Sequence, residues 1–132
     1  MQEKLILVVD DEAAILQVLS ALFKSEGYTT RCTQNGAEAL EIVAHENIKL
    51  CLVDLRMPNM NGMQLCGQIK QIRPDMEIFA LSAYVDAVPQ EELQKKGFSR
   101  TFTKPFKVDE LMAACAEIID GTGTPAPGGT SE

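Results

Sequence analysis

The chain has 132 residues, within the usual range for one domain, and 45% of them are hydrophobic, too many for a wholly disordered chain. The formal net charge of −7 argues against direct nucleic-acid binding, because phosphate contacts need clustered Lys and Arg. No apolar run approaches the roughly 20 residues of a membrane helix, and the start MQEKLILVVDDE lacks a secretory-signal pattern. We therefore expect one cytoplasmic domain with no membrane contact.

Five short apolar or β-rich runs follow one another along the chain. Several are almost continuously apolar, which is typical of parallel strands that are covered on both faces. Strands are predicted at residues 5–9, 28–32, 48–53, 77–81 and 100–103.

Amphipathic segments alternate with these strands. Apolar residues recur at helical spacing from Ile15 to Phe23, and Gly27 is expected just beyond the end of that helix. Further helices are predicted at 36–46, 63–72, 87–96 and 108–120, with Pro89 in the first turn of the fourth. Strands that alternate with helices predict right-handed βαβ units and a doubly wound α/β fold, a five-stranded parallel sheet with five helices.

The composition changes after Asp120. Residues 122–132 are rich in Gly, Thr and Pro and contain no residue that would anchor them to a core. They are predicted to form a flexible tail or a truncated linker, which places the folded domain at 1–121.

The cysteines and the histidine are expected to be structural. Cys32, Cys51, Cys66 and Cys115 form no CxxC pair and are too dispersed for a zinc site. Their apolar neighbours indicate small core residues in a reducing compartment. The only histidine, His45, lies near a helix end and is interpreted as a surface residue.

Reactive side chains follow the predicted strands directly. The first strand ends in Asp10-Asp11-Glu12, the third in Asp54, the fourth in Ser82 and the fifth in Lys104. In open parallel sheets, ligands bind outside these carboxyl ends. If strands one and three are neighbours, their carboxylates repel one another unless a cation lies between them, and such oxygen ligands suit Mg²⁺. Together with the lysine and the hydroxyl, they predict a site for a phosphoryl group on a carboxylate.

Four sequence strings resemble the receiver domain of two-component response regulators. They are VVDDE at 8–12, DLRMPNMNG at 54–62, LSAY at 81–84 and TKPF at 103–106, in the right order at the ends of strands one, three, four and five. The resemblance covers about residues 4–120. It implies a flavodoxin-like topology with strand order 2-1-3-4-5.

The resemblance also implies a role for each acid. Asp54 would be the phosphoacceptor, attacking the phosphorus of a phosphohistidine on a partner kinase. Asp11 would bind Mg²⁺ (or Mn²⁺) directly, together with Asp54 and the backbone carbonyl of Arg56. Asp10 would act mainly through metal-bound water.

The remaining roles concern the phosphoryl oxygens. The resemblance implies that Lys104 pairs with them, and that the hydroxyl of Ser82 and the backbone N–H of Ala83 hold the others. Ser82 alone also suits the N-cap of the fourth helix, and the two roles are compatible. Because family members usually hold the corresponding bond cis, a cis Lys104–Pro105 bond is expected.

One position departs from the family pattern. Most receivers carry Tyr or Phe three residues before the lysine, and that ring turns inward when the hydroxyl residue moves to the phosphate. Thr101 occupies this position, and Phe102 falls on the opposite face of the strand. We expect the phosphorylation chemistry to survive, and the switch to run through the loop after Ser82, with Tyr84 as a substitute reporter.

The expected partners follow from the resemblance. They are a histidine kinase or phosphotransfer protein as donor and a downstream effector domain or protein as output, and a phosphorylation-dependent homodimer is also expected. The domain would catalyse only its own phosphorylation and dephosphorylation.

Three other functions have to account for the same residues. A haloacid-dehalogenase-type phosphatase would need an acid/base two residues after the nucleophile, where Arg56 cannot transfer protons near neutral pH. A flavodoxin-like flavin binder would need a hydroxyl- and Gly-rich loop after strand one, where this chain has three acids. A pseudo-receiver that only binds partners would not need the complete acceptor set.

Overall fold

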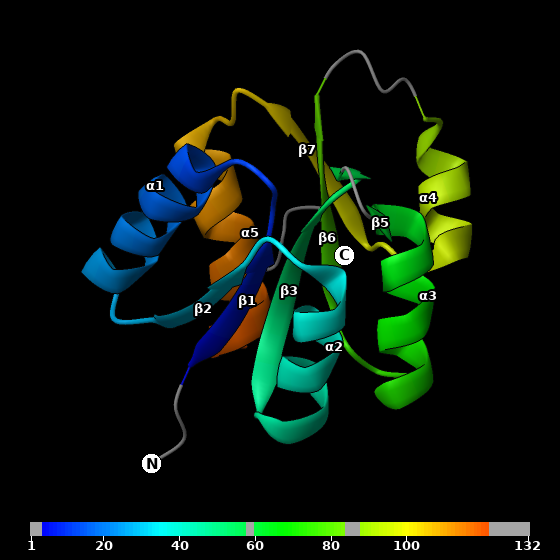
Figure 1. Ribbon diagram of the computed structural model, residues 1–132. Helices are drawn as coiled ribbons and strands as arrows, with labels where there is room; N and C mark the ends of the chain where they lie inside the picture. The colour runs from blue at the N-terminus through cyan, green and yellow to red at the C-terminus, as the bar shows by residue number, and fades with distance from the viewer. Residues whose placement is uncertain (1–3, 58–59, 84–87, 122–132) are drawn as a thin grey trace.

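A parallel sheet organises the chain in the computed structural model, which describes residues 4–57, 60–83 and 88–121. The strand order is β2-β1-β3-β6-β7, which is the predicted order 2-1-3-4-5 of the five sheet strands (Figure 1). The strands are β1 (Leu5–Val9), β2 (Thr29–Thr33), β3 (Ile48–Asp54), β6 (Ile78–Ala83) and β7 (Arg100–Lys104). The predicted doubly wound topology is therefore confirmed.

Helices cover both faces of this sheet (Figure 1). One face carries α1 (Ala13–Ser25) and α5 (Val108–Asp120). The other carries α2 (Gly36–His45), α3 (Gly62–Ile72) and α4 (Gln90–Lys96). Each face has its own hydrophobic cluster, and both clusters share the central strands.

The first strand shows why the centre of the sheet is rigid. Leu7 and Val9 pack into the cluster beneath α2 and α3, whereas Ile6 and Val8 pack into the cluster beneath α1 and α5. All four side chains are completely buried. Each such side chain contributes about 1.5–3 kcal/mol relative to an exposed one. The residues that follow β1 therefore start from a fixed backbone.

Glycines and a proline set the helix boundaries. Gly27 and Gly97 lie just beyond α1 and α4 with φ of 86° and 117°, a left-handed conformation that glycine adopts without steric cost. The predicted start of the fourth helix was wrong: α4 begins at Gln90, with Pro89 as its N-cap. The residue before a proline is disfavoured in the helical region, so Val88 stays outside the helix. Residue 87 of the prediction lies outside the described residues.

Several strands run further than predicted. β6 extends to Ala83 instead of residue 81, because it pairs with β7 as far as Lys104. β3 also extends by one residue, to Asp54. In contrast, β6 begins one residue later than predicted, at Ile78, and β2 is shifted by one residue to Thr29–Thr33. A short antiparallel pair, β4 (Arg56–Met57) with β5 (Met60–Asn61), was not predicted. Most of the reactive side chains thus lie within, or directly after, paired strands.

One cysteine differs from the prediction. Cys51, Cys66 and Cys115 are buried, and burial raises their pKa values to about 12, 11 and 12, which keeps the thiols protonated. Cys32 is exposed. It lies on β2, an edge strand, where no further strand covers its flank.

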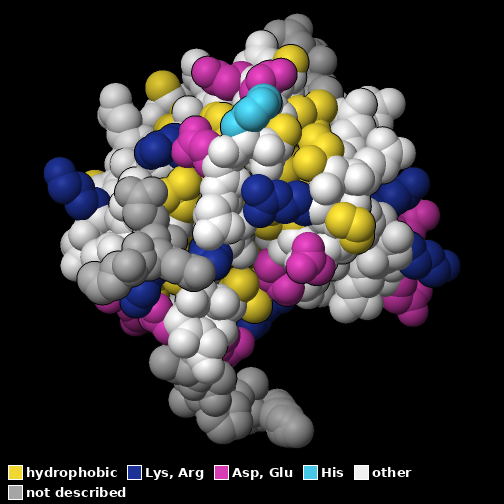
Figure 2. Space-filling model, turned by 90° about the horizontal axis from the view of Figure 1, so that it is seen from below, with side chains coloured by type: hydrophobic (Ala, Val, Ile, Leu, Met, Phe, Trp, Pro, Cys, Tyr) yellow, Lys and Arg dark blue, Asp and Glu magenta, His cyan; other side chains and the backbone are white. Residues whose placement is uncertain are grey.

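The lower face of the molecule mixes both charge signs (Figure 2). The only histidine lies there at the surface, which confirms the interpretation of His45. Its Nδ1 lies 2.9 Å from the carbonyl oxygen of Glu41 and 3.5 Å from that residue's carboxylate. Among the described helices, none is long and apolar enough to cross a membrane.

Candidate functional site

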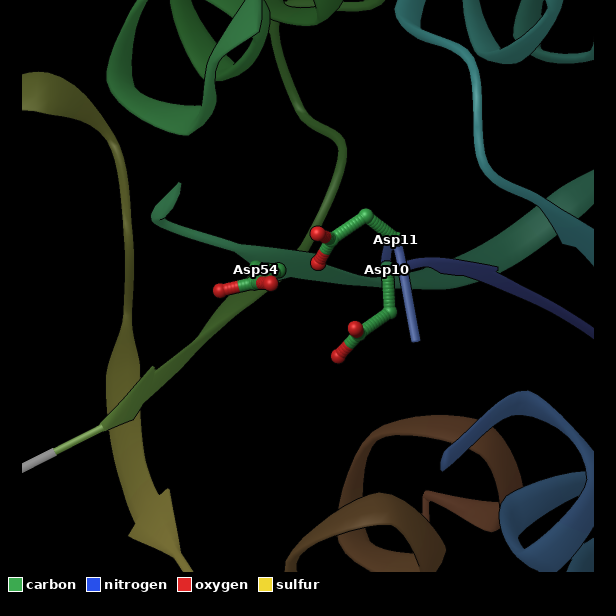
Figure 3. Close-up of side chains that lie close together, drawn as sticks. All are labelled: Asp10, Asp11 and Asp54. Atoms are coloured by element: carbon green, nitrogen blue, oxygen red, sulfur yellow. The ribbon is translucent and has the colours of Figure 1, made fainter. Parts of the chain in front are cut away.

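Three carboxylates converge at the carboxyl ends of two adjacent strands. Asp10 and Asp11 follow β1, and Asp54 ends β3, which pairs with β1 in parallel. Their side chains turn toward a shared space (Figure 3). One ligand oxygen from each carboxylate lies within 4.8 Å of the others. The sequence-predicted cluster is thus brought together.

Backbone amides orient two of these carboxylates. Oδ1 of Asp10 accepts a hydrogen bond from the N–H of Glu12 at 2.9 Å. Oδ1 of Asp54 accepts one from the N–H of Arg56 at 3.1 Å. Each is an aspartate bonded to the backbone two residues on, a local turn that fixes the side chain. Both aspartates are buried, Asp10 fully and Asp54 with 4% exposure.

Lys104 faces this cluster from the end of β7. Its Nζ lies 2.9 Å from Oδ2 of Asp10 and 3.5 Å from Oδ2 of Asp54. The bond to Pro105 is cis, as expected. Oε1 of Glu12 lies 3.6 Å from the same nitrogen, a contact that sequence reasoning missed. The position of Glu12 directly after two aspartates was the only sequence signal for this contact.

The surroundings change how the site ionises. Burial is the main cause that raises the pKa of Asp54 from 3.8 to about 6. The neighbouring charge of Asp10 raises it further, while the Arg56 amide and Lys104 lower it. Burial alone would lower the pKa of Lys104, but Asp10, Asp54 and Glu12 outweigh it and raise that pKa. Lys104 therefore stays charged, and Asp54 holds a proton more readily than an ordinary aspartate.

The residues present fit a hard cation. Oδ2 of Asp10 is buried, and although Lys104 lies at ion-pair distance, no donor of the described residues is aligned for a hydrogen bond with this oxygen. Within the described ranges, Lys104 is the lysine that forms ion pairs with this cluster, through Asp10 and Asp54, so the three carboxylates leave negative charge in excess. Carboxylate oxygens with this excess charge are the ligands that Mg²⁺ prefers.

Ser82 and Ala83 end β6 beside Lys104. Ala83 pairs in register with Lys104, and Leu81 pairs with Asp54 on the other side. The Ser82 side chain is largely buried, and its Oγ donates to the carbonyl oxygen of Ala83 at 2.9 Å. The strand order therefore places both residues at the same edge of the sheet as the acids.

Thr101 and Phe102 point to opposite faces of β7, as predicted. Phe102 packs against Phe79 with ring centroids 5.5 Å apart, in the cluster beneath α1 and α5. Thr101 instead lines a hollow of about 280 Å³, together with Ser82 and Leu93. Its Oγ1 is buried and has no hydrogen-bond partner within the described ranges. Tyr84, the predicted reporter, lies outside the described residues.

The sequence places this chain among known signalling proteins. Residues 6–116 match the model of the response regulator receiver domain family. Sporulation initiation phosphotransferase F of Bacillus subtilis (strain 168) is 34% identical over 119 residues, which is 90% of this chain and 95% of that protein. The DNA-binding transcriptional regulator NtrC of Escherichia coli (strain K12) is 35% identical over 119 residues. That match again covers 90% of this chain, but the chain spans only 25% of NtrC.

Solved structures agree with the sequence matches. A CheY-like response regulator receiver domain protein from Methanospirillum hungatei JF-1 superposes with a TM-score of 0.82 at 27% identity, covering 91% of this chain and 96% of that one. The response regulator protein TrrA from Thermotoga maritima, solved in complex with Mg²⁺ and BeF, gives 0.78 at 32% identity, covering 87% and 98%. These matches give no support to the phosphatase or flavin-binding alternatives.

Proposed function

This chain belongs to the response regulator receiver family of two-component signalling, and from that premise we propose that Asp54 is its phosphoacceptor. A histidine kinase or a phosphotransfer protein would donate the phosphoryl group from a phosphohistidine. The observation that carries the proposal is the cluster of Asp10, Asp11 and Asp54 within 4.8 Å, with Lys104 facing it. Isolated turn or cap aspartates would not need to converge in this way.

The transfer itself is a displacement at phosphorus. A carboxylate oxygen of Asp54 attacks the phosphorus, the new P–O bond forms as the P–N bond of the phosphohistidine breaks, and the released imidazole takes a proton from solvent. The hydrogen bond from the Arg56 amide holds the Asp54 carboxylate in one orientation before the donor arrives. Holding a reactant in place in this way lowers the entropic part of the barrier.

A metal ion completes the proposed site. Asp11, Asp54 and the backbone carbonyl of Arg56 would hold Mg²⁺ or Mn²⁺ directly, and Asp10 would contribute through water. When bound, the ion neutralises negative charge on the carboxylates and on the transferring phosphoryl oxygens. The Mg²⁺ and BeF complex of TrrA supports this assignment by analogy.

Lys104, Ser82 and Ala83 would bind the phosphoryl oxygens. Lys104 is already held at the site by its ion pairs with Asp10 and Asp54. The hydroxyl of Ser82 would exchange its bond to the carbonyl of Ala83 for a phosphoryl oxygen, and the Ala83 N–H would bind another. This exchange would start the conformational switch in the loop after β6, with Tyr84 as the reporter, because Thr101 replaces the aromatic ring that usually has this role.

The proposed output of this domain is the control of a downstream effector. The name of NtrC, a DNA-binding transcriptional regulator of which this chain matches a quarter, supports a downstream effector domain or protein. We also propose a phosphorylation-dependent homodimer, a cytoplasmic location, and no catalysis beyond the domain's own phosphorylation and dephosphorylation. The folded unit would comprise residues 1–121, with 122–132 as tail or linker.

A small phosphoryl donor tests the acceptor role. Phosphoramidate, which carries a P–N bond, should add one phosphoryl group in the presence of Mg²⁺, detected by intact mass. Asp54→Asn should abolish the adduct, and the matched control Asp75→Asn, at an exposed position after α3, should retain it. An adduct of unchanged yield on Asp54→Asn would refute the proposal.

A further inference from the structure

Among the described glycines, Gly62 has the least room for a side chain. It is buried as the first residue of α3, and a Cβ built on it would overlap the carbonyl oxygen of Asp54 and lie 2.8 Å from the Cα of Leu55. Non-bonded carbon atoms prefer about 3.5–4.0 Å. The φ of Gly62 is not in the left-handed region, so close approach of two backbones accounts for glycine here.

Further contacts hold the same turn of the chain. The N–H of Gly62 donates to the carbonyl oxygen of Leu55 at 3.1 Å. Arg56 pairs with Asn61 across β4 and β5, and the Arg56 N–H donates to the Asp54 carboxylate. The backbone from Asp54 to Arg56 is therefore held between the end of β3 and the start of α3. Gly62 lies where these two elements come closest.

We propose that Gly62 is a positioning residue for phosphoryl transfer to Asp54. Because it lacks a side chain, α3 begins directly against the Asp54 peptide, and this contact fixes the Asp54 carboxylate and the Arg56 carbonyl relative to each other. The inference rests on the proposed function, which assigns both groups to the metal and the phosphoryl group. Gly62 itself touches none of the reacting atoms.

The size of the effect follows from the geometry. Any side chain would push the start of α3 away from the Asp54 peptide, or push that peptide out of place, by on the order of 1 Å. Misplacement of a reacting group by that distance lowers a rate by about 10²-fold. Asp10 and Asp11 follow β1, whereas Asp54 ends β3, so a displaced Asp54 peptide would not carry their carboxylates with it. The cluster would therefore lose its alignment and not merely shift as a unit.

The chain offers matched variants. Gly67 lies in the same helix, and a Cβ there meets nothing within 4 Å, so Gly67→Ala should stabilise α3 without touching the site. The double variant Gly62→Ala/Gly67→Ala then offsets part of the strain. Asn61→Ala removes the cap of α3, a hydrogen bond from the Met63 N–H at 2.7 Å, but adds no atom beside Asp54.

The rate of phosphorylation by acetyl phosphate, measured with saturating Mg²⁺ at about 10 °C, separates an effect on the position of Asp54 from an effect on the stability of the fold. Folded states are near their maximum stability at this temperature. The double variant should react about 30-fold or more slowly than Gly67→Ala, and Asn61→Ala should stay within about threefold of the parent. In the metal-free proteins, the amide shifts of Leu55 and Arg56 should change in the double variant and stay unchanged in Gly67→Ala.

Three results would overturn the inference. They are a double variant that reacts as fast as Gly67→Ala, an Asn61→Ala variant that is slowed as much as the double variant, and a double variant that stays unfolded, since the steric cost would then fall on the fold. Failure of the proposed function is distinguishable, because the parent and Gly67→Ala would then take no phosphoryl group at Asp54. The metal-free amide shifts would still report the local geometry.

Discussion

Asp54 is buried beside other acids, where a charged carboxylate costs free energy of folding but has the charge that the proposed function requires. Burial raises its pKa to about 6 from the ordinary 3.8, while the folded structure keeps it beside two other acids. Above about pH 6 the carboxylate is charged, as its two proposed roles, cation binding and attack on phosphorus, require. Below that value the proton competes with both roles.

Binding of Mg²⁺ should therefore weaken in acid. The protonated carboxyl is a poor ligand, so the dissociation constant for Mg²⁺ should rise about tenfold between about pH 7.5 and about pH 5, one unit below the raised pKa of Asp54. Titration calorimetry at the two pH values measures this change. Asp54→Asn should bind weakly at both values and lose most of the pH dependence. A parent protein with equal affinity at both would contradict the assignment of Asp54 as a ligand.

Thr101 carries another unusual group, a buried side-chain hydroxyl. Its Oγ1 is buried and unpaired in the described part of the chain, and an unpaired buried hydroxyl costs about 1–3 kcal/mol. Thr101→Val keeps the shape and removes the hydroxyl, so we expect the free energy of unfolding to rise by about 1 kcal/mol. Urea denaturation is the measurement, and Thr103→Val, at an exposed position of the same strand, is the control. A loss of stability in Thr101→Val would show that the hydroxyl has a partner, such as a bound water.

At the scale of elements, β6 and β7 stay paired as far as Ala83 and Lys104, but the two faces of this pair differ. On one face Phe102 of β7 packs against Phe79 of β6, whereas on the other the hollow beside Thr101 leaves the end of β6 and the start of α4 room to move. Thr101 is β-branched and comparatively fixed at χ1, so it cannot report the switch as an aromatic ring would. The readout should therefore lie on the β6 side.

A phosphoryl mimic tests this division. On adding beryllofluoride with Mg²⁺, we expect large amide shifts at residues 82–90 and small ones at 99–103, recorded by NMR. Moving the ratio of active to inactive state from roughly 1:99 to 99:1 requires the mimic to favour the active state by about 5.5 kcal/mol. With this preference, the amide shifts should reach a plateau as the mimic is added. A dominant rearrangement around Thr101 would place the switch in β7 instead.

Some of these strands and helices could be predicted from the sequence, and others could not. The apolar runs and the acids directly after them predicted the parallel sheet and the edge at which Asp10, Asp11 and Asp54 lie, because parallel strands end at one edge. That strands one and three are neighbours, which brings the acids together, was implied by the family resemblance. The start of α4 was missed because Pro89 suits both an N-cap and a first turn. β4 and β5 were missed because two-residue strands show no alternation.

Two features differ in how far the sequence could reveal them. Cys32 was predicted to be a core residue, but Arg31 and Thr33 flank it, and its exposure agrees with these polar neighbours and with the position of β2 at the sheet edge. Gly62 stands in the recognised DLRMPNMNG string, but its contact with the Asp54 peptide depends on how α3 packs against β3. The contact of Gly62 is not encoded in local spacing.

At the scale of the whole molecule, the fold holds a charge cluster that works against its own stability. Binding of a cation to the folded state should relieve this repulsion. At a cation concentration ten times the dissociation constant, the free energy of unfolding should rise by about 1.4 kcal/mol. Thermal unfolding should therefore shift upward by about 4–7 °C on adding Mg²⁺. Asp11→Ala should remove most of that shift, and Asp109→Ala, an exposed acid at the start of α5, should retain it. An undiminished response in Asp11→Ala would move the metal site elsewhere.

We propose that the fold presents one carboxylate, that of Asp54, for phosphorylation. The most direct measurement is to phosphorylate the protein with acetyl phosphate and Mg²⁺, reduce the product with borohydride, which converts an acyl phosphate to homoserine, and map the modified peptide by mass spectrometry. We expect homoserine at residue 54 and at no other aspartate. A phosphoryl group found instead on Ser82 or Thr101, or homoserine at Asp10 or Asp11, would contradict it.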